Sequence, residues 1–191
     1  FAVISIAGPN SRQLLNRVSS DDFTNSGFPY YTHRIVEIGP AIVRAARLSY
    51  VGELGWELYI PSESALPVFD ALREAGDDLG LKLAGIEALS SLRIERGYRA
   101  WGHEIGPGET PLEAGLEFAV EFENPFTFLG KEALLQQKNK GISRRLVMLT
   151  VKDSKAFPQG GEPIWWNKSL VGYTTSGTFG HTLDCGVMMG Y

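Results

Sequence analysis

Cysteine and histidine are scarce in this 191-residue chain, which contains one cysteine and three histidines. A single cysteine, Cys185, forms no internal disulfide and no thiolate metal cluster, and it favours a reducing compartment. The histidines, His33, His103 and His181, lie far apart without the spacing of metal ligands. The sequence therefore predicts no metal site.

Positive charge and long apolar runs are also lacking. The chain has 18 basic and 22 acidic residues, a net charge of −4, whereas a sequence-independent phosphate binder needs a positive surplus. The longest apolar runs, such as residues 146–149, are far too short to span a bilayer. We therefore expect neither a nucleic-acid partner nor a membrane segment. With 43% hydrophobic residues, the chain has enough apolar material for a sizeable core.

The common catalytic signatures are missing as well. No phosphate-binding Gly-x-x-x-x-Gly-Lys-Ser/Thr loop and no serine nucleophile elbow is present. The nearest approach to a dinucleotide fingerprint, residues 106–108, lacks the third glycine and the following helix.

The pattern of elements predicts an α+β fold. Apolar alternation predicts strands at 1–6 and within 34–60, with a turn at Gly39-Pro40, and a further strand at 116–122. Helical periodicity predicts four helices. They are a helix with Pro9 as its first residue, a helix after Ser62 or Ser64 with the inner stripe Leu66, Phe69 and Leu72, a helix over 85–96 with Ile86, Leu89 and Leu92 or Arg93 inside, and a helix over 130–138.

The pattern of predicted elements changes after a polar hinge at 138–141. Short strands are expected at 145–151, 163–166, 170–174 and 187–191, with a hairpin turn at Asn167-Lys168, which is typical of a small barrel or sandwich. We place a domain boundary near residue 142, giving regions 1–142 and 143–191. Since both ends fall inside strand-like sequence and no targeting segment is present, we interpret the chain as a piece of a longer protein whose site is incomplete here.

One segment, 48–57, has the composition of a ligand site. It carries two glycines and two acids, and strand alternation places Glu57 and Tyr59 on one face and Trp56 on the other. A carboxylate beside an aromatic wall can accept two parallel hydrogen bonds from an amidine-like edge, such as that of a pterin. A plain hairpin with exposed acids is the alternative interpretation.

A second cluster covers residues 93–116, where a charged helix end leads into an aromatic residue and a glycine-rich loop. Its composition alone indicates a solvated helix and a structural loop.

Seven motifs in order resemble the glycine-cleavage T-protein (aminomethyltransferase) family over nearly the whole chain. They are Gly-Pro-x-Ser at 8–11, Tyr-x-Gly-Glu-x-Gly-Trp-Glu at 50–57, Leu-Arg-Ile-Glu-x-Gly at 92–97, Trp-Gly-x-Glu-Ile at 101–105, Thr-Pro-Leu-Glu-Ala-Gly-Leu at 110–116, Phe-Leu-Gly-Lys-Glu-Ala-Leu at 128–134 and Val-Gly-x-Thr-Thr-Ser-Gly at 171–177. Two motifs, Arg-Ala-Trp-Gly at 99–102 and Pro-Leu-Glu-Ala-Gly-Leu-Glu at 111–117, are most similar to the C-terminal, folate-binding half of dimethylglycine and sarcosine dehydrogenases.

The resemblance implies a site for tetrahydrofolate. Tyr50 matches an aromatic that lines it, and Glu57 matches the acid that holds the pterin edge. Phe118 falls at the position of an aromatic that stacks on the cofactor, although a core residue on a strand is an equal alternative. Trp101 occupies an aromatic position of the loop motif, where packing is the simpler role.

Three departures from the family pattern limit the site. Leu89 stands where the T-protein has an arginine. The catalytic aspartate and a further arginine of the family have no match in this sequence, so no catalytic residue is assigned here. Glu53, Glu95 and Glu113 are loop or helix-end acids and are not put in the place of that aspartate.

The resemblance implies a fold of mixed α/β domain portions followed by a small, incomplete β-barrel, and it implies a function in one-carbon metabolism. An FAD domain outside this sequence would oxidise an N-methyl amine, and this region would pass the carbon to tetrahydrofolate. The bacterial cytoplasm or mitochondrial matrix is the implied location. Two alternatives stay open: a non-catalytic module like the regulatory subunit of pyruvate dehydrogenase phosphatase, and a stand-alone aminomethyltransferase that acts on a lipoyl carrier protein.

Overall fold

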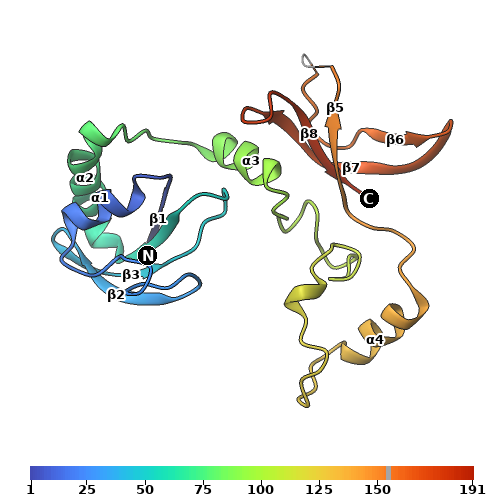
Figure 1. The fold of residues 1–191 in the computed structure, drawn as a ribbon, viewed down its shortest axis with the longest axis horizontal. Coiled ribbons are helices and arrows are strands. Elements are labelled where there is room, and N and C mark those ends of the chain that lie inside the picture. The colour runs from blue at the N-terminus through green and yellow to red at the C-terminus, as the bar shows by residue number, and fades with distance from the viewer. Residues whose placement is uncertain (154–155) are drawn as a thin grey trace. The chain divides into compact units, whose positions relative to one another are not determined.

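The computed structural model describes residues 1–153 and 156–191, which form two compact units, Phe1–Leu89 and Ser90–Tyr191 (Figure 1). The fold is α+β, as predicted. The strands are β1 Ala2–Ala7, β2 His33–Ile38, β3 Ala41–Ala46, β4 Gly55–Ile60, β5 Val147–Val151, β6 Pro163–Trp166, β7 Ser169–Gly180 and β8 Cys185–Gly190. The α-helices are α1 Ser11–Val18, α2 Ala65–Gly76, α3 Ile86–Glu95 and α4 Lys131–Lys140.

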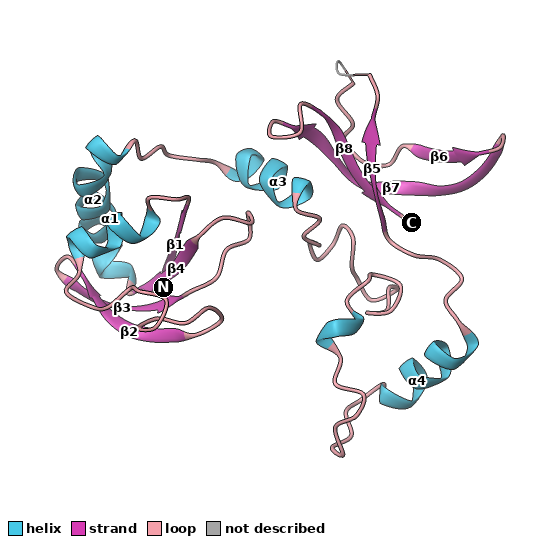
Figure 2. Ribbon diagram, viewed as in Figure 1, coloured by secondary structure: helices cyan, strands magenta, loops and turns pink. Residues whose placement is uncertain are grey.

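The first unit is an antiparallel sheet in the order β1-β4-β3-β2, with α1 and α2 packed against each other on one face (Figure 2). Strand β4 alternates as predicted. Trp56, Leu58 and Ile60 are fully buried on one face, whereas Glu57 and Tyr59 are half-buried on the other. Trp56 packs edge-on against Phe23 and Phe28, at ring-centroid distances of 5.6 and 6.2 Å. The core therefore lies between the helices and one face of the sheet.

Two details of the predicted helices in this unit are wrong. Helix α1 begins at Ser11, because Gly8 has a φ of 125° and a turn precedes the helix, so Pro9 lies outside it. In α2 the predicted inner residue Leu66 is 68% exposed, whereas Val68 is buried. The buried residues of α2 are Val68, Leu72 and Gly76, which lie four residues apart on one helix face. Of the predicted stripe, Leu72 belongs to this face and Leu66 does not.

Helix α3 contains the boundary between the two units. Its buried residues are Ser91, Arg93 and Ile94. Ile86 is 70% exposed, so its prediction as an inner residue is wrong. Leu89 is half-buried, and of the two alternatives Leu92 and Arg93 it is Arg93 that lies inside. Gly97 ends the helix with a φ of 68°, as the sequence predicts.

The second unit ends in an antiparallel sheet in the order β5-β8-β7-β6, a half-barrel. Asn167 and Lys168 form the predicted hairpin turn, with φ values of 48° and 64°, the left-handed geometry of a two-residue turn. Strand β7 is longer than predicted and has a register shift between Thr174 and Ser176. Such a bulge redirects the side chains next to it.

Residues 116–122 do not form the predicted strand. A short 3-10 turn spans Glu117–Ala119, and Phe118 is 86% exposed. The predicted hinge at 138–141 is also partly wrong, because α4 continues to Lys140 before Gly141 ends it. The compact units divide after Leu89, and the domain boundary near residue 142 stays a prediction.

Candidate functional site

Tyr50 and Glu57 line the same small cavity in the first unit. The cavity has a volume of about 30 Å³ and is bordered by the ends of β1 and β4 and by residues 48–51. That volume has room for only one or two water molecules. Tyr50 and Glu57 therefore lie on one wall of a cavity that is too small to enclose a ligand, and their assignment to a folate site stays a prediction.

Two glycines of the 50–57 motif shape this wall. Gly55 opens β4, where an added Cβ would lie 2.6 Å from the carbonyl oxygen of Ile6. Any larger residue would therefore push β4 away from β1. Gly52 has a φ of 75°, which side-chain-bearing residues adopt rarely. The glycines let the loop that carries Tyr50 turn back beside β4.

The carboxylate of Glu57 lies in a defined setting. Ser5 is its partner on β1 and Ala46 its partner on β3. Tyr59, two residues along the same face of β4, donates a hydrogen bond to Oε2 of Glu57 at 2.7 Å. This hydrogen bond raises the pKa of the Tyr59 phenol. Since a carboxylate has about four lone-pair positions, Glu57 retains capacity to accept donors from a ligand.

Trp101 and Phe118 belong to the second unit, and both are exposed, at 72% and 86%. Neither packs into a core, so the packing role expected of Trp101 and the core alternative for Phe118 are wrong for the structure described. Their assignment to the same site as Glu57 stays a prediction.

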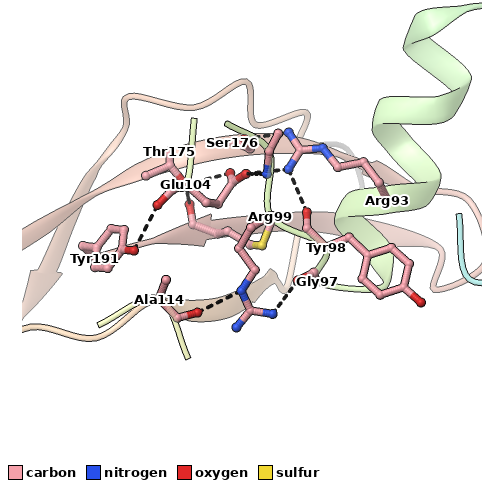
Figure 3. A network of polar contacts seen from close by, with 11 residues as sticks. Arg93, Gly97, Tyr98, Arg99, Glu104, Ala114, Thr175, Ser176 and Tyr191 are labelled. Carbon is pink, nitrogen blue, oxygen red and sulfur yellow. Dashed lines mark hydrogen bonds and ion pairs between the residues drawn. The ribbon is translucent and has the colours of Figure 1, made fainter. Parts of the chain in front are cut away.

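A buried polar network organises the second cluster of the sequence (Figure 3). Arg93 on α3 pairs with Glu104, with Nη1 and Oε2 2.6 Å apart, and donates through Nη2 to Ser176 at 3.0 Å. Thr175 donates to Oε1 of Glu104 at 2.9 Å, and the phenol of Tyr191 donates to the Glu104 backbone carbonyl at 3.0 Å. The network ties α3 and the loop after it to the bulged part of β7.

Glu104 stays ionised in this setting. Burial alone would raise its pKa, but hydrogen bonds from Ser176, the Ala100 N–H and Thr175, together with the charge of Arg93, outweigh burial and lower it. Because these contacts are to other parts of the same unit, we assign the pair a structural role.

The Arg99 side chain closes the glycine-rich loop. It donates to the carbonyl of Ala114 at 2.9 Å and to that of Gly97 at 2.8 Å. Gly115 has a φ of 68°, and an added Cβ would lie 2.9 Å from Nη2 of Arg99. The loop that carries Trp101 is thus fastened at both ends.

Glu95 and Glu113 have structural partners, in agreement with their interpretation as loop and helix-end acids. Glu95 accepts hydrogen bonds from the backbone N–H groups of Thr182 and Leu183 at the β7–β8 turn. Glu113 accepts from the Thr110 N–H at 3.0 Å and pairs with Arg144.

Within residues 1–153 and 156–191, no group of three or more histidine, cysteine, aspartate or glutamate side chains is arranged to hold a metal ion. The same residues contain no helix with both the length and the apolar character that crossing a bilayer requires.

Family models match most of the chain. Residues 1–124 match the GCVT N-terminal domain, and residues 144–191 match the glycine cleavage T-protein C-terminal barrel domain. The chain belongs to the glycine cleavage T-protein family.

Relatives of this chain include longer proteins. It is 46% identical over its full length to human mitochondrial sarcosine dehydrogenase and 40% identical to human mitochondrial dimethylglycine dehydrogenase, covering 21% and 22% of those proteins. The crystal structure of the glycine cleavage system aminomethyltransferase T from Bartonella henselae is similar, with a TM-score of 0.84 and 28% identity over 99% of this chain and 50% of that one. The chain thus spans about a fifth to a half of the length of these proteins.

Sequence reasoning singled out Tyr50 and Glu57 but missed Tyr59 as a partner of Glu57 and Glu104 as the centre of a buried network. The two-residue alternation of β4 carried the signal for Tyr59. No sequence signal distinguished Glu104 from the other acids of its loop.

Proposed function

We propose that this T-protein-family chain is the folate-binding, one-carbon transfer region of an FAD-dependent N-methyl amine dehydrogenase of the sarcosine or dimethylglycine type. The observation that carries the proposal is the placement of Tyr50 and Glu57 at one cavity on β4. The identities of 46% and 40% over the full chain to sarcosine and dimethylglycine dehydrogenases support the choice of branch. In this proposal the FAD domain, which oxidises the amine substrate, is a separate part of the intact protein.

The residues present fit the pterin edge of tetrahydrofolate. That edge offers a ring N–H and an amino group side by side, and Glu57 offers two acceptor oxygens with a negative charge. Tyr50 adds an aromatic side chain beside the carboxylate. Leu89, which stands where the T-protein has an arginine, also lines the cavity. At that position the side chain therefore offers the cofactor an apolar contact and no positive charge.

Tetrahydrofolate, when bound, supplies the nitrogens that take up the one-carbon unit. Glu57 would bind and orient the far edge of the ring, and Tyr50 would limit its tilt. Because holding a reactant in the right geometry replaces a large part of the entropic barrier, positioning is the contribution of these residues to the rate. Retaining the carbon at this site would also keep formaldehyde from escaping. We assign this chain no proton-transfer group.

Two other functions share the fold. The similarity to the Bartonella aminomethyltransferase, of which the chain spans half, supports a stand-alone aminomethyltransferase as the second candidate. A non-catalytic regulatory module would not need the Glu57 carboxylate. We place the protein in the mitochondrial matrix or the bacterial cytoplasm, the location implied by its family resemblance.

The fate of the methyl carbon tests the function. The intact protein is given sarcosine or dimethylglycine with limiting tetrahydrofolate, and free formaldehyde and methylenetetrahydrofolate are measured. We expect the wild type to release less formaldehyde than the Glu57→Ala variant at equal amine oxidation. Comparing the two at the same folate concentration cancels the spontaneous condensation in solution. Equal release by both proteins would contradict the proposal, and absence of amine oxidation would favour the alternatives.

A further inference from the structure

The residues opposite Glu57 on the two neighbouring strands, Ser5 on β1 and Ala46 on β3, both have short side chains. A glutamate with short neighbours on both sides samples several rotamers, and ordering it on ligand binding then costs conformational entropy. A residue that fixes the carboxylate beforehand would remove that cost.

Tyr59 meets this requirement. It lies on the same face of β4 as Glu57, half-buried, and its phenol donates to Oε2 at 2.7 Å. The tyrosine ring is stiff because it has only two side-chain torsions, so its hydroxyl is a defined anchor point. The pKa of the phenol is raised, so it remains a protonated donor at neutral pH.

The phenol of Tyr59 is also a neutral donor, which matters for a carboxylate that has to bind a ligand. A lysine or arginine at this position would neutralise Glu57 and compete with the ligand for it. A neutral phenol occupies one of about four lone-pair positions and leaves the negative charge in place. The carboxylate therefore keeps its attraction for a pterin N–H pair while losing rotational freedom.

We propose that Tyr59 is a positioning residue of the folate site, which holds the Glu57 carboxylate in the orientation that meets the pterin edge. The proposal rests on the proposed function of Glu57. Tyr59 acts through Glu57 alone, so its contribution must vanish when the carboxylate is absent. A residue that merely stabilises the sheet would not show this dependence.

The test is a double-mutant cycle on tetrahydrofolate affinity in the intact protein. Wild type, Tyr59→Phe, Glu57→Ala and the double variant are titrated calorimetrically with tetrahydrofolate. Tyr59→Phe keeps the ring and removes only the hydroxyl, and its melting temperature is recorded to check folding. Tyr31→Phe, which removes an exposed phenol from the same unit, is the matched control.

We expect Tyr59→Phe to bind about threefold to tenfold more weakly, the loss of one net hydrogen bond, and to have no effect in the Glu57→Ala background. Wild-type affinity in Tyr59→Phe would overturn the proposal, as would an equal loss in both backgrounds. In either case the wild type still binds and the proposed function stands. Failure of the wild type to bind would overturn both.

Discussion

Arg93 and Glu104 form an ion pair inside the second unit, with Nη1 and Oε2 2.6 Å apart and side chains only 5% and 0% exposed. The pair joins α3 to the loop that carries Trp101, and Thr175 and Ser176 connect it to β7. Removing one partner of such a pair leaves the other charge buried and uncompensated, which is far more costly than losing an exposed pair.

Glu104→Gln is therefore expected to destabilise the second unit by about 3–5 kcal/mol. Native-state hydrogen exchange of residues 169–190 in the intact protein measures the local opening free energy. Glu117→Gln is the control, because Glu117 pairs with Lys138 at an exposed site, with side chains 53% and 47% exposed, and should cost at most about 1 kcal/mol. Equal effects of the two substitutions would show that the buried pair contributes no more than the exposed one.

The pH dependence of this unit follows from the same pair. The lowered pKa of Glu104 means that its contribution to stability is fully present above the ordinary carboxylate value of 4.5 and is lost as the pH falls below it, through the folded-state pKa. We expect the difference in unfolding free energy between wild type and Glu104→Gln to shrink as denaturant titrations are moved from about pH 6 to about pH 3. These two pH values lie on either side of the ordinary pKa of a glutamate side chain. A difference that stays constant over this range would contradict the assignment.

Trp56 is expected to be the largest single contributor to the first core. It is fully buried, contacts Phe23 and Phe28, and has the guanidinium carbons of Arg12 and Arg47 at 5.9 and 5.6 Å from its ring centroid. Trp56→Ala should cost about 3–5 kcal/mol in unfolding free energy.

The matched control for Trp56 is Ile42→Ala on β3, where the side chain is 63% exposed. It should change the unfolding free energy by no more than about 0.5 kcal/mol. Hydrogen exchange of the β3 and β4 amides gives both values. A small effect of Trp56→Ala would mean that the core collapses around the missing ring.

Phe118 tests the part of the site that the second unit is predicted to supply. If its ring stacks on the folate, Phe118→Ala should weaken tetrahydrofolate binding about twofold to tenfold, since such stacking adds roughly 0.5–1.5 kcal/mol. Phe126→Ala is the control, because this ring is exposed to a similar degree, 78%, in the same unit. Titration of both variants of the intact protein distinguishes a specific contact from a general effect, and equal affinities would remove Phe118 from the site.

The sequence predicted those features that depend on local pattern. Alternation placed Trp56 and Glu57 on opposite faces of β4, and the positive-φ turn at Asn167-Lys168 followed from the residue types. The motif acids and glycines likewise brought Tyr50 and Glu57 to one cavity.

Features that depend on tertiary contacts were missed. The run 116–122 alternates like a strand, but no neighbouring strand pairs with it in the described unit, and a 3-10 turn forms instead. Arg93 is buried in α3 because Glu104, eleven residues later, folds back to it. Neither the missing pairing nor the buried pair can be read from local spacing, because each depends on segments that meet only in the folded chain.

The measurement that tests the central claim most directly is calorimetric binding of tetrahydrofolate to the intact protein, wild type against Glu57→Ala. Glu53→Ala, which removes an exposed acid from the same motif, serves as the control. We predict a loss of about 30- to 150-fold for Glu57→Ala, corresponding to roughly 2–3 kcal/mol for a charge-assisted pair, and unchanged affinity for Glu53→Ala. Wild-type affinity in Glu57→Ala would contradict the assignment of Glu57 as the residue that holds the pterin.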